Sequence, residues 1–393
     1  MATVNSIGVA PLPVTVNNQT AFGEVSVAQN TGRIFGQFTY NLNTELFSND
    51  STASGTVTVT PPFANISSGA ATNSTGVLTS EDVLEYFPGI GALARFTALY
   101  TTGVVGNTQF VGIGTALNGL FIGFNGVDFC INRRASGTNN ITTQANFNVD
   151  KLDGTGPSTM TLDPTKGNVY QISYQWLGFG QITFSVEDPL GGRFTVFHAI
   201  RYANANTTTS ITQSTLPFKI ESNNTTNATA IVVKVPSLAA FIQGTPGTES
   251  FLIHGASNSK TLTTEVAVLT IRNNTTYAGV PNFILVSPLN ISAASDGAKS
   301  VLFNLYKNAT LGGVPSFVDY NANTSVMSID KAGTTVTGGI LLSSIALNKS
   351  SNLIYPIANS GFKLHPGDTL TVSAVSAGSN DVVVSIMWQE RFK

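Results

Sequence analysis

The chain has 393 residues, a formal net charge of −2 and only 10% charged residues, against about 25% in an average soluble domain. This near-neutral balance excludes the basic footprint of a protein that binds DNA or RNA. A single cysteine, Cys130, excludes a disulfide framework and a cysteine-based zinc cluster. A surface of Asn, Thr, Ser and Gln favours a protein that packs closely against neighbours, because free monomers normally use charge to stay apart.

The start of the chain carries no basic stretch followed by an apolar core, so we expect no signal peptide. No apolar run approaches the ~20 residues of a membrane helix, and we expect no membrane insertion. Pro11 and Pro13 stand among alternating valines in residues 1–25. This segment predicts an extended arm that pairs with a neighbour, or else simple disorder.

Strands are predicted at residues 35–40, 56–60 and 94–101, with one helical turn opening at residues 80–83. A hairpin follows, because residues 120–124 and 129–131 are apolar and Asn125-Gly126 stands between them. Apolar residues then alternate with polar ones over 170–176, 182–186 and 194–200, which predicts a three-stranded meander. Its first turn lies at Gly178-Phe179-Gly180. A further strand is expected at 231–235.

The apolar run 238–242 ends in a Gly- and Pro-containing segment, 243–248, which we interpret as a domain boundary. Beyond it, strands are predicted at 265–271, 283–286, 301–306, 340–347, 370–375 and 382–388. The predicted fold class is all-β, with two antiparallel β-sandwich domains. The expected organisation is an arm over 1–25, a β-sandwich over 26–243, and a jelly-roll-like sandwich over 244–393. The hairpin 121–126, together with the strand that contains Trp176, resembles a concanavalin- or laminin-G-like sandwich, which the resemblance implies for 26–243.

Three runs, 150–158, 161–170 and 174–180, resemble a segment of the structural proteins of tailed phages and large double-stranded DNA viruses. The runs 186–189, 200–206 and 115–129 continue the resemblance, which covers roughly residues 20–243. The part after 244 resembles small jelly rolls of viral fibres and trimeric capsid-associated proteins. The resemblance implies a virion structural protein of minor capsid, decoration or fibre type, made in the host cytoplasm and located in the virion.

No pattern in the sequence points to catalysis. Glu187 and Asp188 form the one acidic pair beside an aromatic strand, but neighbours in a strand point to opposite faces and cannot share a cleft. The three histidines have no metal-ligand spacing. Acidic side chains in the loops of the sandwich could line a calcium site: Asp128, Asp150, Asp153 and Asp163. We predict no catalytic residues, no cofactor and no resident metal.

Two functions are therefore expected from the sequence. The first is assembly: a homo-oligomer, with a trimer favoured, that contacts other virion proteins through neutral faces. The second is carbohydrate binding, as an adhesin or a host receptor-binding protein. Phe179 and Tyr202 are the candidate glycan-contacting aromatics, on the expectation that both rings are exposed.

Overall fold

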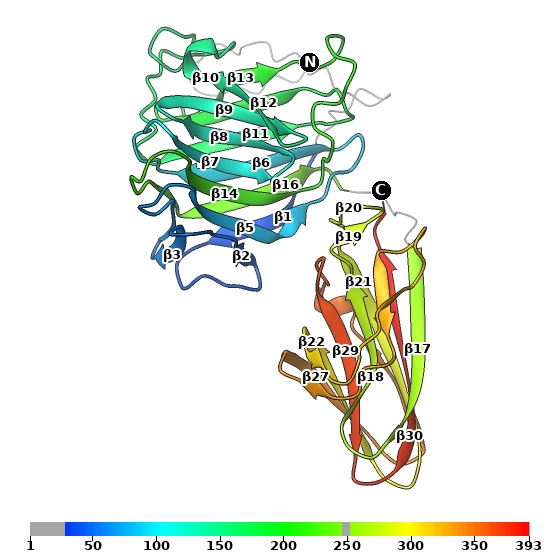
Figure 1. The fold of residues 1–393 in the computed structure, drawn as a ribbon. Helices are drawn as coiled ribbons and strands as arrows, with labels where there is room; N and C mark the ends of the chain where they lie inside the picture. Colours follow the sequence, from blue (N-terminus) through cyan, green and yellow to red (C-terminus); the bar gives the residue numbers. More distant parts are fainter. Residues whose placement is uncertain (1–27, 246–251, 393) are drawn as a thin grey trace, which may run out of the picture.

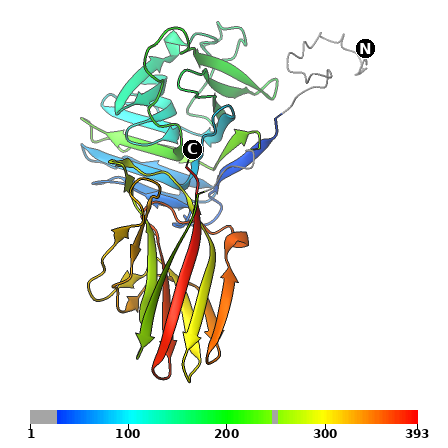
Figure 2. The same ribbon diagram turned by 90° about the vertical axis from the view of Figure 1, so that its right-hand side faces the viewer.

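The computed structural model describes residues 28–245 and 252–392, which form two antiparallel β-sandwiches (Figure 1), stacked end to end as Figure 2 shows. The described residues contain two short 3-10 turns, η1 (Gln144–Asn146) and η2 (Ala358–Ser360), and no helix long enough and apolar enough to cross a membrane. This confirms the all-β prediction with two sandwich domains. The predicted arm over 1–25 lies outside the described residues.

A six-stranded and a seven-stranded sheet face each other in the N-terminal sandwich, and a three-stranded sheet closes one side (Figure 1). The six-stranded sheet has the order β1 (Asn30–Gln37), β16 (Ser237–Gln243), β6 (Gly91–Ala98), β11 (Asn168–Tyr174), β12 (Ile182–Asp188) and β13 (Arg193–Ile200). The seven-stranded sheet has the order β10 (Thr138–Thr143), β9 (Asp128–Ala135), β8 (Gly119–Asn125), β7 (Asn107–Gly114), β14 (Leu216–Asn224), β5 (Ser74–Leu84) and β2 (Phe47–Asn49). The third sheet joins β15 (Val232–Val235), β4 (Phe63–Ser67) and β3 (Thr56–Thr60).

Aromatic rings fill the space between these two large sheets. Phe96 lies 5.6 Å from Tyr170 and 5.7 Å from Phe218, so residues of both sheets meet in one cluster. The period-2 pattern of the predicted meander places Tyr170 and Ile172 inward, and both are fully buried. Offset and edge-on ring pairs of this kind each add about 0.5–1.5 kcal/mol beyond the burial of their area.

The C-terminal sandwich is a jelly roll. Its eight main strands have the order 1-8-3-6 in one sheet and 2-7-4-5 in the other, which is the arrangement of two nested Greek keys. The first sheet has the order β17 (Leu252–Leu262), β30 (Asn380–Glu390), β21 (Val286–Asp296) and β28 (Ser351–Pro356). The second has the order β24 (Val318–Asp319), β25 (Met327–Asp330), β18 (Val266–Asn273), β29 (Thr369–Ser376), β22 (Val301–Lys307) and β27 (Ile340–Leu347). Two short hairpins are β19 (Thr276–Tyr277) with β20 (Val280–Pro281), and β23 (Thr310–Leu311) with β26 (Val336–Thr337).

Trp388 is the largest fully buried side chain of the C-terminal core. Its indole N–H donates to the Glu390 carboxylate at 2.7 Å, and Glu390 also accepts from the Val326 backbone at 2.8 Å. A buried carboxylate therefore has the hydrogen-bond donors that it needs.

Three local predictions need correction. Residues 80–83 belong to strand β5 and form no helical turn, because Ser80 pairs with Phe47 of β2 and Val83 pairs with Pro217 of β14, on either end of an irregularity in the β5–β14 register. The strand predicted at 283–286 starts only at Val286, since Asn282 and Asn273 side chains take up the preceding backbone groups. The hairpin turn predicted at Asn125-Gly126 starts one residue later, because Asn125 is the last residue of strand β8 and Gly126, with a φ of 61°, follows it.

Candidate functional site

Two adjoining pockets open at the boundary between the sandwiches, where the β19–β20 hairpin meets the N-terminal sandwich. The larger, here called the polar pocket, has a volume of about 490 Å³ and includes Asp50, Thr79, Asn118, Thr212, Gln213 and Lys219 in its lining. The smaller, here called the aromatic pocket, has a volume of about 250 Å³ and includes Tyr277, Phe283 and Phe392. Domain boundaries are a preferred place for ligand sites, and the larger pocket has an ordinary size for one.

The polar pocket lies over the outer face of the seven-stranded sheet. On this face Gly112, Gly114 and Gly119 surround Phe121, and a Cβ at Gly114 or Gly119 would collide with the Phe121 ring. The glycines thus let a large ring lie flat against the sheet and keep the surface above it low. Gly112 and Gly114, whose Gly-x-Gly spacing lacks a nucleotide-binding context, have this packing role.

A buried ionic group supports the floor of the pocket. The Arg134 guanidinium forms a bidentate ion pair with the Glu221 carboxylate, in which Nη1 donates to Oε2 at 3.3 Å. The guanidinium also lies 4.8 Å from the centre of the Phe121 ring. Lys219 Nζ lies 3.8 Å from the same carboxylate. Burial lowers the pKa of Lys219 and Arg134 lowers it further, although Glu221 acts in the opposite direction. Arg134 and Glu221 satisfy each other and hold the sheet surface in place.

The loop between β13 and β14, residues 201–215, forms one wall and is fixed by side chains from several strands. Trp176 Nε1 donates to the Ile211 carbonyl at 3.2 Å, and Tyr174 Oη donates to the Ser214 carbonyl at 2.9 Å. Arg133 donates to the Ser210 carbonyl at 2.6 Å. A wall anchored at several points needs little ordering when a ligand binds.

Two carboxamides in the polar pocket have free donors. The Asn118 carbonyl oxygen accepts from the Thr212 backbone at 2.9 Å and from its hydroxyl at 3.0 Å. The Gln213 carbonyl oxygen accepts from the Thr215 backbone at 3.3 Å. In the described part of the chain neither side-chain NH₂ has a hydrogen-bond partner, so both point donors at whatever fills the pocket.

The charges of the polar pocket balance. The Asp50 carboxylate accepts from the Thr79 hydroxyl at 3.0 Å and from the Ser48 hydroxyl at 3.2 Å, and Lys219 supplies one opposite charge. The remaining lining is apolar or uncharged, with Leu117, Pro217 and Val280 among it. Such a pocket suits an uncharged ligand that has apolar surface together with a few hydrogen-bonding groups.

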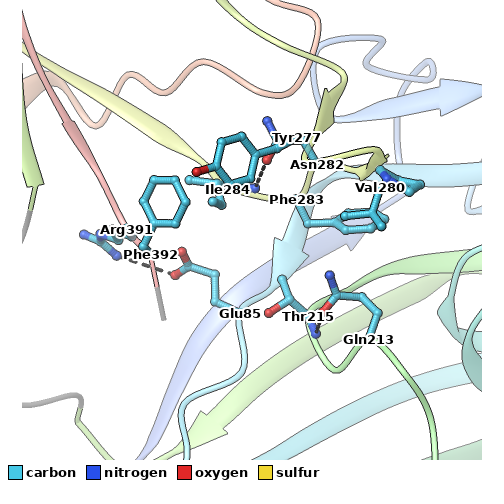
Figure 3. A pocket seen from close by; sticks show the side chains of 11 residues that line it. Glu85, Gln213, Thr215, Tyr277, Val280, Asn282, Phe283, Ile284, Arg391 and Phe392 are labelled. Atoms are coloured by element: carbon cyan, nitrogen blue, oxygen red, sulfur yellow. Dashed lines mark hydrogen bonds and ion pairs between the residues drawn. The ribbon is translucent and has the colours of Figure 1, made fainter. Parts of the chain in front are cut away.

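The β19–β20 hairpin brings the C-terminal sandwich to the site. Ala278 and Gly279 both have positive φ, at 49° and 78°, as the two central residues of a tight hairpin turn require. The Asn282 amide donates to the Asn273 side chain at 2.7 Å and to the Asn274 carbonyl at 2.6 Å. The hairpin is therefore held at its base. Figure 3 shows its Tyr277 and Phe283, with Phe392, facing Glu85, Thr215 and Gln213 across the aromatic pocket.

Charged side chains join the two sandwiches beside the pockets, and we call this group the clasp. It consists of acids from the N-terminal sandwich and bases from the C-terminal one: Glu45, Asp82 and Glu85 with Lys307, Lys363, His365 and Arg391. The shortest links are Lys307 to Glu45 at 2.7 Å and His365 to Asp82 at 3.2 Å. The clasp fixes the orientation that creates the pockets.

His365 lies between Asp82 and Asp368, at 3.2 Å from each. Burial alone would lower its pKa, but the hydrogen bonds and charges of the two carboxylates raise the pKa of His365 to about 9. Burial would raise the pKa of Asp368, but hydrogen bonds from His365 and Asn308 lower it to about 2. The His365 bridge is thus charged at neutral pH.

The two aromatics proposed from the sequence lie together, with ring centres 6.2 Å apart. The expected exposure of Tyr202 is wrong: its ring is buried, because the Arg133 guanidinium covers it at 5.3 Å. Phe179 is half-buried in the turn after β11. Neither residue lines the polar or the aromatic pocket, and glycan contact at this pair stays a prediction.

The acidic residues considered for calcium do not converge. Asp153 and Asp163 cap their own turns through Thr155 and Thr165, and Asp150 accepts from the backbones of Leu152 and Ser158. Within residues 28–245 and 252–392 no three His, Cys, Asp or Glu side chains are grouped as a metal site would require. Burial raises the pKa of the Cys130 thiol to about 12, as expected for a small core side chain.

Sequence reasoning missed the pocket residues themselves: Asp50, Asn118, Gln213, Lys219 and Phe283. They come from distant parts of the chain, and amides are so frequent here that no single Asn or Gln stands out. The glycines at 112, 114 and 119 were the usable signal, since glycines at alternate strand positions indicate a surface on which something lies flat.

No protein-family model matches the sequence, and no curated protein matches it. Among solved structures, one described under endo-acting O-glycanases of human gut microbiota has a TM-score of 0.39 and 11% identity, and covers 54% of this chain and 99% of that chain. The cellulose induced protein Cip1 has a TM-score of 0.35 and 13% identity, covering 53% and 96%. The metal-free Emp46p carbohydrate recognition domain has a TM-score of 0.34 and 9% identity, covering 54% and 96%. Likenesses this distant do not bear on the ligand, which has to be inferred from the pockets.

Proposed function

We propose that this chain is a non-catalytic carbohydrate-binding attachment protein and that the polar pocket holds its ligand. One observation carries the proposal: Asn118 and Gln213 have their carbonyl oxygens bound internally and their NH₂ donors free, in a pocket whose charges balance. Sugars offer hydroxyl oxygens to such donors and apolar ring faces to Leu117, Val280 and Phe283. Asp50 adds an acceptor for sugar hydroxyls.

A conservative substitution tests the proposal. Asn118→Asp keeps the oxygen that accepts from Thr212 and removes the free donor, so the fold should persist while binding is lost. We expect at least a tenfold weaker signal on an array of neutral glycans, corresponding to roughly 1.4 kcal/mol. Asn348→Asp, in an exposed turn outside both pockets, is the matched control. Absence of binding to every array glycan by the unsubstituted chain would overturn the proposal.

A virion location for this attachment protein is supported by the resemblance of residues 20–243 to viral structural proteins and by the uncharged surface. On this proposal the protein is a decoration or fibre component that meets host-surface glycans. Antibody against the chain should label intact particles. Its absence from purified particles of the source virus would contradict that location.

A second candidate function, assembly, is favoured by one edge of the C-terminal sandwich. Strands β27 and β28 are the last strands of their sheets, contain no charged residue, and expose large aliphatic side chains. The exposed ones are Ile340, Leu341, Leu342, Leu353 and Ile354. Natural proteins normally protect such edges with charge, so this edge is suited to pair with another subunit.

Sedimentation tests the assembly function. The chain should run as an oligomer, with a trimer favoured, and Leu341→Lys should shift it to the monomer because it places a charge in the apolar edge. Leu190→Lys, at an exposed leucine of the β12–β13 turn, should leave the mass unchanged. A monomeric unsubstituted chain at micromolar concentration would argue against assembly by this edge.

A further inference from the structure

We propose that the polar and aromatic pockets act as one cleft that binds an extended, neutral glycan chain, with neighbouring sugars on the two sides of Phe283. This inference rests on the proposed carbohydrate binding and adds the class of ligand: a linear uncharged oligosaccharide, in place of a single terminal sugar or an acidic polysaccharide.

The two pockets adjoin each other. Gln213, Val280, Pro281 and Phe283 line both of them, so these four residues form the border that a glycan chain would cross between the polar side and the aromatic side. A chain lying along the hairpin would pass from the donors of Asn118 to the rings of Tyr277 and Phe392. On this proposal a single sugar occupies one side, whereas linked sugars occupy both.

The two sides offer different chemistry. The polar side has free amide donors and an acceptor at Asp50. On the aromatic side Tyr277 and Phe392 meet edge to face, with ring centres 5.4 Å apart, and both are half-buried. Figure 3 shows the Phe392 ring on the wall opposite Thr215. Partly exposed rings suit the apolar C–H face of a sugar, while the amides suit its hydroxyls.

The charges in the two pockets favour a neutral glycan chain over an acidic one. Each pocket contains one acid and one base: Asp50 with Lys219 on the polar side, and Glu85 with Arg391, 3.5 Å apart, on the aromatic side. No cationic surplus is offered to sulfate, phosphate or sialic acid groups in either lining. A neutral chain therefore fits both halves of the cleft, and an acidic one would be poorly compensated.

A length series tests this inference. The probe is an array that carries linear neutral glycans of one to six sugars, together with sulfated and sialylated glycans. For the neutral series that binds best, the Kd should fall about threefold to tenfold between one sugar and three. This fold-change corresponds to the free energy of one aromatic contact. Acidic glycans should not bind more tightly than neutral ones of equal length.

Phe392→Leu keeps an apolar side chain and removes the ring, so it should abolish the gain in binding between one sugar and three. Phe35→Leu, at an exposed phenylalanine of β1, is the matched control. If short sugars bind in an Asn118-dependent manner but length has no effect, or if Phe392→Leu keeps the full gain, the cleft is wrong and the proposed function stands. If no glycan binds at any length, the proposed function itself fails.

Discussion

The boundary between the sandwiches has two regions that differ in the chemistry of their side chains. The clasp is charged, and its acids and bases pair across the boundary at 2.7–3.7 Å. The polar pocket beside it uses amides and hydroxyls, and two amide donors there have no partner among the described residues. In a chain with only 10% charged residues, the clasp gathers charged side chains where the domains are held, whereas the polar pocket has one acid and one base among uncharged residues.

This difference has a physical basis. The acids and bases of the clasp already satisfy each other, so they gain little from contact with a neutral ligand. A fixed amide with a free donor loses little on binding, since its orientation is set beforehand. The clasp therefore fixes the relative orientation of the two sandwiches, and the polar pocket supplies the contacts with the ligand.

The largest expected effect comes from removing the ionic support below the pocket. Arg134→Met should lower the free energy of unfolding of the N-terminal sandwich by about 3–5 kcal/mol, because it leaves the buried Glu221 carboxylate with only Lys219 nearby. Urea unfolding followed by circular dichroism measures this. Arg193→Met, at an exposed strand end, should cost less than about 0.5 kcal/mol. Equal midpoints for the two variants would contradict the assigned role of Arg134.

The clasp should respond to alkaline pH. Because the folded-state pKa of His365 is raised from 6.5 to about 9, its contribution is complete below pH 6.5 and is lost as pH rises through 9. The shift corresponds to at most about 3 kcal/mol. Asp368, with its pKa lowered to about 2, contributes above pH 3.8 and loses this only as pH falls toward 2. Small-angle scattering should show one orientation of the domains from pH 5 to 8 and a looser one at pH 10.

His365→Gln is the control for this pH dependence. It should remove the change between pH 8 and 10, since no group at this position titrates there. Scattering profiles of the unsubstituted chain that are identical at pH 7 and pH 10 would show that His365 does not hold the boundary.

A smaller effect is expected for the most exposed part of the clasp. Lys307 contacts Glu45, whose side chain is about half exposed, so Lys307→Met should cost only about 1 kcal/mol. It should nevertheless weaken glycan binding, because the orientation of the hairpin depends on the clasp. Calorimetric titration with the best array glycan checks this, and Lys349→Met, in an exposed turn, is the control. An unchanged glycan affinity of Lys307→Met would show that glycan binding does not depend on the clasp.

The strands in which apolar and polar residues alternate could be predicted from the sequence alone. Alternation predicted β11, β12 and β13, and residues 301–306 and 340–347 nearly match β22 and β27. It failed at residues 80–83, where helix-opening residues lie in a strand because pairing with β2 and β14 outweighs local preference.

The site was beyond a reading of the sequence for a different reason. The free donors of Asn118 and Gln213 depend on the hydrogen bonds that fix their carbonyl oxygens. The position of Phe283 in the pocket lining depends on the docking of one sandwich on the other. The exposed aromatic expected at Tyr202 is covered by Arg133, from a strand nearly 70 residues earlier. Long-range contacts of this kind leave no periodic signal in the chain.

The central claim is that a neutral glycan binds at the domain boundary, and a crystal structure of the chain with the best array glycan tests it most directly. We predict density for the sugar within hydrogen-bond distance of Asn118 Nδ2 and Gln213 Nε2, continuing past Phe283 toward Phe392. Density at Phe179 and Tyr202 with an empty boundary would contradict the account.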